Sequence, residues 1–164
     1  MIKPVLTIGD PRLGSSSEPI GIHEFNTPWL NSLIDDLVDT AKFKQGVGIA
    51  GVQIGVLKRI AIIEYDTTNT RYSNIGSCPL TVVINPEIEP VGNELSTLNE
   101  GCLSVPVARG DVTRYKKLKY RFYDQYGNLH TGTRDDFFVR VLQHELDHMN
   151  GIVFPMRISG EVSL

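Results

Sequence analysis

The residues best suited to chemistry lie near the C-terminus, where His144-Glu145-Leu146-Asp147-His148 places two imidazoles four residues apart with a carboxylate directly after the first. On a helix, residues four apart share a face, so both rings can reach one metal ion. Glu145 then lies beside the water that such an ion binds. The motif predicts a metal-activated water with a carboxylate base.

A catalytic site of this type needs a third protein ligand and an open position. Phe154 stands where the extended metzincin pattern has its third His, and the only later carboxylate is Glu161 in a short tail. Cys102 is the leading upstream candidate, because a thiolate is a strong ligand for borderline and soft divalent metals. His23 and His130 are alternatives, but their polar, loop-like neighbours favour surface positions.

The alternative interpretation of the two imidazoles is structural, since a single His on a buried helix is more often a hydrogen-bonded core residue than a ligand. Two imidazoles and Glu145 on one turn without an ion would leave several polar groups in need of partners. Each unsatisfied group costs about 1 to 3 kcal/mol. A bound cation satisfies them together, so the metal site is the preferred interpretation.

Three motifs resemble those of the peptide deformylase family, hydrolases that remove the N-formyl group from newly made polypeptides. An HExxH motif alone has false positives among buried helices, whereas three matching motifs in the same order are specific. The resemblance extends from the first predicted strand to Phe154. In chain order, the motifs are Gly46-Val47-Gly48-Ile49-Ala50-Gly51-Val52-Gln53, Glu100-Gly101-Cys102-Leu103-Ser104 and Gln143-His144-Glu145-Leu146-Asp147-His148.

The resemblance implies a mechanism in which Glu145 takes a proton from the activated water and later gives it to the leaving amine, with release of formate. The side-chain amide of Gln53 and the backbone N–H of Leu103 would stabilise the developing oxyanion. A tight pocket around the formyl carbon would reject acetyl groups. The resemblance also implies one divalent ion per chain, with Fe(II) expected and Zn, Ni or Co as replacements.

The resemblance further predicts that an extended peptide pairs with the protein backbone as an added strand. Its methionine side chain would enter an apolar pocket. The predicted backbone contacts are Val47, Gly48 and Gly101, the predicted pocket walls are Phe137 and Val141, and Arg109 is a candidate contact for the peptide backbone or its carboxylate. Flexible glycine connections, a solvated loop arginine and a surface amide at Gln53 are the alternative interpretations of these positions.

Two departures from the family pattern affect these expectations. The first motif usually ends Ala-Ala-Pro-Gln, whereas here it reads Ala50-Gly51-Val52-Gln53, so we expect a less rigid loop and lower activity than in a more typical member. Many bacterial members continue into a C-terminal helix linked to ribosome docking. The ten residues after Phe154 leave no room for a comparable helix, so we expect no stable ribosome association.

Composition agrees with a single domain over residues 1–164, since a chain that is 41% hydrophobic can bury one substantial core. The net charge of −3 and the lack of a basic stripe argue against nucleic-acid binding, and the short cluster Arg114-Tyr115-Lys116-Lys117 is interpreted as a solvated strand edge. No apolar run reaches membrane-spanning length and no secretory signal is present. We expect a cytoplasmic monomer without membrane partners, in which Cys78 and Cys102 stay reduced.

Hydrophobic periodicity predicts a helix from Thr27-Pro28 to Ala41, strands over 59–65 and 80–84 with a loop over 66–77 between them, and a hairpin over 117–132. The metal helix is apolar on nearly every face, with Thr133 and Asp136 as a capping box and Gly151 as its stop. We therefore predict an α+β fold in which short antiparallel strands pack around a central C-terminal HExxH helix, with one N-terminal helix.

Two other functions stay open at this point. A metalloprotease that cuts internal peptide bonds would need a third ligand after the metal helix, which Phe154 disfavours. A non-enzymatic relative that binds formylated or methionine-led peptides is suggested by the altered Gly51-Val52 pair. Intact Glu145 and Gln53 argue against a loss of activity.

Overall fold

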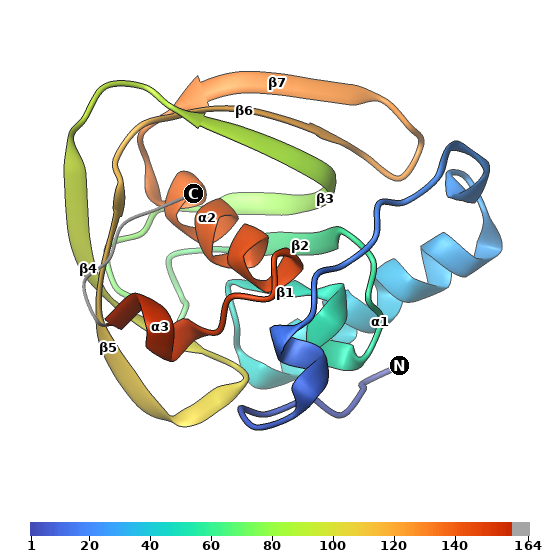
Figure 1. Cartoon of the computed structure of the whole chain (residues 1–164), viewed down its shortest axis with the longest axis horizontal. Coiled ribbons are helices and arrows are strands. Elements are labelled where there is room, and N and C mark those ends of the chain that lie inside the picture. Colours follow the sequence, from blue (N-terminus) through green and yellow to red (C-terminus); the bar gives the residue numbers. More distant parts are fainter. Residues whose placement is uncertain (159–164) are drawn as a thin grey trace.

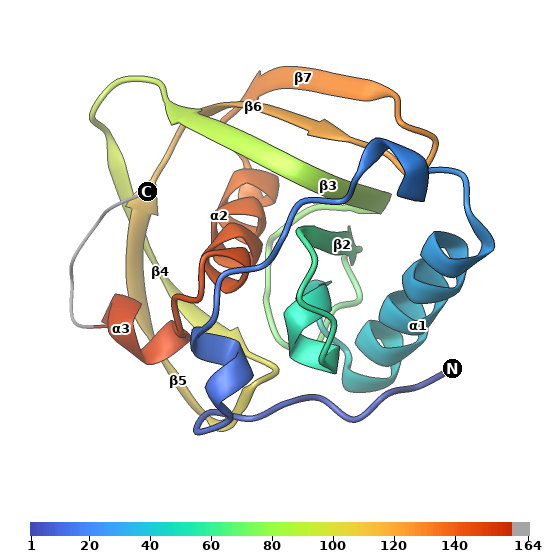
Figure 2. The ribbon, with the colours of Figure 1, turned by 45° about the vertical axis from the view of Figure 1, so that its right-hand side comes forward.

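Strand β2 (Ile60–Tyr65) is buried on both faces because a helix packs against each of them. The computed structural model, which describes residues 1–158, places Ile60 and Ile62 against α1 (Pro28–Lys44). Successive side chains of a strand point to opposite faces, so Ile63 meets α2 (Phe137–Met149) instead. Figures 1 and 2 show α1 and α2 on either side of this part of the sheet.

Two antiparallel sheets enclose the central helix α2 (Figure 1). The five-stranded sheet contains, in spatial order, β1 (Gly48–Ala50), β2, β3 (Cys78–Pro90), β6 (Leu118–Tyr123) and β7 (Leu129–Arg134). The second sheet is a long ribbon of β4 (Leu95–Cys102) and β5 (Val105–Tyr115), and a short helix, α3 (Phe154–Ile158), packs on β5. The predicted α+β class, with antiparallel strands around the HExxH helix, is confirmed.

Helix α1 begins as predicted. The Thr27 hydroxyl accepts a hydrogen bond from Leu30 N at 3.2 Å, and Pro28 occupies the first helical position, where its missing N–H costs nothing. Its apolar stripe packs on the sheet while Asp35 and Asp39 stay exposed.

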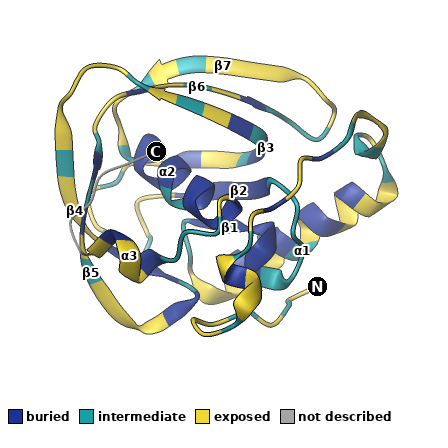
Figure 3. Cartoon of the chain, in the orientation of Figure 1, coloured by how far each residue is buried: buried dark blue, intermediate teal, exposed yellow. Residues whose placement is uncertain are grey.

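Helix α2 is buried along most of its length (Figure 3), which confirms its predicted central position. The predicted capping box is wrong. Thr133 lies in β7, and the carboxylate of the N-cap residue Asp136 accepts from Arg134 (Nε at 3.1 Å) instead of capping the helix. The chain turns away after the helix at Gly151, whose φ of +73° suits glycine, so the predicted stop is confirmed.

Strand β2, the loop over 66–77 and the β6–β7 hairpin agree with the predictions. Strand β3 continues past its predicted end at Asn85-Pro86, because Asn85 adopts a φ of +51° at an irregularity in the pairing with β6 and the strand then resumes. The Asn85 side chain holds this kink through bonds with the backbone N and O of Ile20, both at 2.9 Å.

Cys78 begins β3 and is buried. Cys78 and Cys102 are both free thiols, as predicted. Glu161 and the rest of the tail considered above lie outside the described residues. Between residues 1 and 158, no helix is both long and apolar enough to cross a membrane.

The packing of α1 on the sheet predicts the effect of a cavity at Leu37, which is 0% exposed. Leu37→Ala should lower the free energy of unfolding by about 2–5 kcal/mol in urea titrations, because the surrounding Ile and Leu side chains only partly close the space. Asp35→Ala, on the exposed face of the same helix, is the matched control and should leave stability unchanged. Equal stability of both variants would contradict this description of the core.

Candidate metal centre

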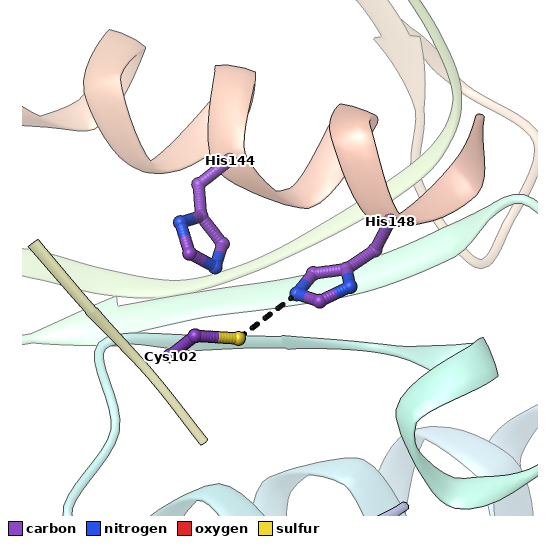
Figure 4. A group of neighbouring side chains, drawn as sticks. All are labelled: Cys102, His144 and His148. Atoms are coloured by element: carbon purple, nitrogen blue, oxygen red, sulfur yellow. Dashed lines mark hydrogen bonds between the residues drawn. The ribbon is translucent and has the colours of Figure 1, made fainter. Parts of the chain in front are cut away.

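Three side chains that can bind metal converge between α2 and the end of β4. The rings of His144 and His148 project from adjacent turns of α2 toward Cys102 (Figure 4). Cys102 Sγ lies 3.4 Å from His148 Nε2, and the potential ligand atoms all lie within 4.8 Å of one another. This is the only such group of His, Cys, Asp and Glu found in residues 1–158.

The donor set fits a divalent ion. Two ligands on a tetrahedral zinc-type ion are roughly 3.5 Å apart, close to the separation of Cys102 and His148. Glu145 Oε2 is buried with no hydrogen-bond partner in the described structure, and Glu145 lines the pocket beside the three side chains. A buried carboxylate oxygen without a partner is costly unless something else in the site satisfies it.

Electrostatic interactions among Cys102, His144 and His148 favour the thiolate form of Cys102. Burial alone would raise the pKa of the Cys102 thiol, but the charge of His148 and hydrogen bonds from both imidazoles hold it well below its usual value. Burial opposes protonation of His144, yet hydrogen bonds to Cys102 and Glu100 raise its pKa well above the usual value. Burial raises the pKa of Glu145, although both imidazoles act in the opposite direction.

Glu100 orients His144. Its Oε1 lies 3.0 Å from His144 Nδ1, and because a carboxylate only accepts, the ring donates there and keeps Nε2 free for a metal. Burial disfavours the charge on Glu100, but hydrogen bonds from His144 and Arg114 hold its pKa well below the usual range. Arg140 of α2 also donates to this carboxylate.

Arg114 corrects the interpretation of its basic cluster as a solvated strand edge. Its side chain is buried and bridges Glu100 (Nε–Oε2, 2.8 Å) to Asp147 (Nη1–Oδ2, 3.0 Å). Asp147 in turn accepts two bonds from Arg157 of α3, at 2.9 and 2.7 Å. Only Lys116 and Lys117 of the cluster are exposed, and they lie in the turn between β5 and β6.

A pocket of about 400 Å³ opens beside His144 and Glu145. The predicted wall residues Phe137 and Val141 line it, which agrees with their helix positions seven and three residues before His144. All three predicted backbone contacts and both predicted oxyanion donors also line it: Val47, Gly48, Gly101, Gln53 and Leu103.

Gln53 is not the surface amide that its sequence context alone suggests. It lies in the 3₁₀ turn Gly51–Ile54 and is 1% exposed. Its Oε1 accepts from Ala50 N at 2.9 Å, which turns Nε2 toward Ser104 Oγ (3.1 Å) and Cys102 Sγ (3.9 Å). The amide therefore presents its N–H donors to the group formed by Cys102, His144 and His148.

Gly48 has a packing role, so the interpretation as a flexible connection is wrong there. A Cβ at this position would lie 3.0 Å from Val141 Cγ1 and 3.3 Å from Glu145 Oε1. Only glycine lets β1 approach α2 this closely without displacing one of these side chains.

The other two histidines lie outside the group formed by Cys102, His144 and His148. His23 and His130 are exposed, as predicted, and His130 pairs with Asp124. Arg109 is exposed on β5 and does not line the pocket; its guanidinium lies 4.8 Å from the centre of the Tyr72 ring. Phe154, which stands in place of a third His, is buried next to Cys102.

Several site residues are not predicted by the sequence pattern. The position of Glu100 could have been predicted, because a residue two before Cys102 on a strand points to the same face of the strand as Cys102. Tyr72 and Arg71 line the pocket from the polar loop over 66–77, where no periodicity identifies them. The partners of Arg114 lie in distant segments, so no local pattern reveals its burial.

Comparison with known sequences identifies one family. The family model described as polypeptide deformylase matches residues 2–163. Peptide deformylase 2 of Ralstonia nicotianae is 44% identical over 158 residues, covering 96% of this chain and 88% of the relative. Peptide deformylase 1 of Bordetella pertussis is 42% identical with the same coverage of both chains.

Solved structures with the same fold belong to the same family. The class I type b peptide deformylase from Acinetobacter baumannii, bound to Met-Ala-Ser, superposes with a TM-score of 0.91 at 35% identity, over 96% of this chain and 99% of that one. Peptide deformylase from Ehrlichia chaffeensis in complex with actinonin gives a TM-score of 0.84 at 33% identity, over 97% and 90%.

The Glu100 contacts predict a double effect for Glu100→Gln. Loss of the carboxylate charge leaves Arg140 without its buried counter-charge and Arg114 with Asp147 as its remaining one, which should lower the free energy of unfolding by about 3–5 kcal/mol. Looser orientation of His144 should weaken zinc binding about 10- to 100-fold in chelator competition. Glu94→Gln, which alters an exposed pair with Lys116, should change neither quantity. Unchanged zinc affinity in Glu100→Gln would contradict the orienting role.

Proposed function

The chain belongs to the polypeptide deformylase family, and we propose that Cys102, His144 and His148 hold its catalytic metal while Glu145 moves the protons of the reaction. The family's members are metal-dependent hydrolases, and the chain removes the N-formyl group from the N-terminal formyl-methionine of newly made polypeptides. The convergence of one thiol and two imidazoles beside Glu145 is the observation that carries the assignment of residues. When bound, the metal supplies Lewis-acid chemistry that lowers the pKa of a water.

Glu145 acts as both base and acid. Its buried carboxylate, with its raised pKa, is suited to take a proton from the attacking water and to return it to the leaving nitrogen. The water oxygen adds to the formyl carbon, the C–N bond breaks, and the products are formate and a free N-terminal amine.

Gln53 and Leu103 stabilise the negative charge that develops on the formyl oxygen. The donor side of the Gln53 amide already faces Cys102, and the Leu103 backbone follows the ligand directly. Preorganised donors of this kind contribute about 10²- to 10³-fold each to the rate.

The peptide binds between two strand edges. Strand β1, carrying Gly48 after Val47, is at the edge of its sheet, and β4 carries Gly101 in a two-stranded ribbon. An extended peptide can pair with such edges, and Phe137 and Val141 offer an apolar wall to its methionine side chain. The Met-Ala-Ser bound to the Acinetobacter baumannii relative supports a methionine-first ligand. We assign Arg109, outside the pocket, to the peptide beyond its first residue.

The metal and the cellular setting follow from the chemistry of the site and its substrate. We propose Fe(II) as the ion used in the cell, with Zn, Ni or Co able to replace it. We place the reaction in the cytoplasm, where new polypeptides carry formyl-methionine, and propose that the protein acts as a monomer without nucleic-acid partners.

Formate release tests the proposed reaction. Protein purified without oxygen should release formate from formyl-Met-Ala-Ser and leave acetyl-Met-Ala-Ser intact. Glu145→Gln should bind metal normally but lose about 10²- to 10⁴-fold in rate, because the proton carrier is gone. No formate from folded, metal-loaded wild-type protein would refute the function, and full activity of Glu145→Gln would refute the role of that residue.

Metal analysis tests the choice of ion. Protein purified anaerobically should contain stoichiometric iron, and its activity should fall in air as ferrous iron oxidises. Cys102→Ser should lose most of the metal, because a neutral hydroxyl is a far weaker ligand than a thiolate. Stoichiometric zinc in the anaerobic protein, with no gain in activity from ferrous iron, would overturn the assignment of iron.

A further inference from the structure

The backbone of Gly101 is already hydrogen-bonded, by a side chain. Gly101 N donates to the Tyr72 hydroxyl at 2.9 Å, and the same hydroxyl donates to Gly101 O at 3.3 Å. A hydroxyl is one donor and an acceptor at once. Tyr72 therefore makes at Gly101 the pair of bonds that a facing strand residue makes in an antiparallel sheet.

These bonds lie on the open edge of β4. Gly101 is opposite Arg109 in the register with β5, yet its N–H and C=O both turn to Tyr72. Among residues 1–158, no further strand pairs with β4. An unpaired strand edge is a template for another extended chain, so the hydroxyl covers the place that the proposed function gives to the peptide.

The Tyr72 ring is held at the pocket by two contacts. Its centre lies 5.1 Å from that of Phe137, a wall of the pocket, and the Arg109 guanidinium lies 4.8 Å from the Tyr72 ring centre. Tyr72 itself lines the pocket. A ligand that reaches Gly101 must therefore move this side chain.

The backbone at Tyr72 is held by hydrogen bonds that do not involve its side chain. Asn69 Oδ1 accepts from the backbone N of Arg71 at 2.8 Å and of Tyr72 at 3.0 Å. The Asn69 amide in turn donates to Gln45 O, at the end of α1. Rotation of the Tyr72 side chain can release Gly101 while these loop bonds stay in place.

We propose that Tyr72 is a specificity-determining residue: its hydroxyl caps Gly101 in the free enzyme and swings away when an extended peptide replaces both bonds. This inference rests on the proposed peptide-binding function. It favours ligands that offer Gly101 a donor and an acceptor together, as a peptide backbone does. A formylated compound without that pair has to displace the hydroxyl without compensation.

Tyr72→Phe separates the hydroxyl from the ring. The variant keeps the packing on Phe137 but has no cap to displace, so KM for formyl-Met-Ala-Ser should fall about two- to tenfold while kcat stays the same. The Kd of the product Met-Ala-Ser, measured by calorimetry, should fall by the same factor. Tyr126→Phe, which removes an exposed hydroxyl on the β6–β7 turn, is the matched control and should change neither constant.

An unchanged or higher KM in Tyr72→Phe, with an unchanged thermal midpoint, would overturn the proposal, because the hydroxyl would then not compete with the peptide. Wild-type activity in the same assay establishes the deformylase function independently. Absence of formate from the wild type would instead refute the function on which the inference rests.

Discussion

The buried carboxylate of Glu100 is the constraint on which the site depends. It accepts hydrogen bonds from Arg114 of β5 and from Arg140 and His144 of α2, so one side chain of β4 links the ribbon to the central helix. A buried charge is stable only when it is fully paired, so substitution of any one of these partners should strongly lower the free energy of unfolding. The same pairing aims His144 at Cys102, so the energetics of the fold and the geometry of the metal group share one interaction.

Local sequence patterns predicted the elements whose stability is local or strongly periodic. The Thr27 cap, the stripe on α1 and the HExxH face of α2 follow from helical spacing, and Cys102 follows from the need for a third ligand. The β4–β5 ribbon is not predicted, because β4 has few β-branched apolar residues and its position depends on contacts with α2. The burial of Arg114 is not predicted for a related reason, because its counter-charges, Glu100 and Asp147, come from other segments of the chain.

The first motif illustrates how far a family pattern can be carried. Gly51 and Val52 replace the usual residues, but both are buried and the 3₁₀ turn still directs Gln53 inward. A Cβ at Gly51 would lie 2.9 Å from Val56 O, so the backbone here packs more closely than a larger residue permits. The lower rigidity expected from the loss of proline stays a prediction.

The separation of the ligands along the chain has a consequence for folding kinetics. Cys102 lies 46 residues before His148, and their contact requires β5 and the β6–β7 hairpin to form in between. Closing such a long loop is entropically unfavourable until the intervening strands have paired. With the proposed ligand set, we therefore expect metal binding to be tight only after this part of the fold has formed.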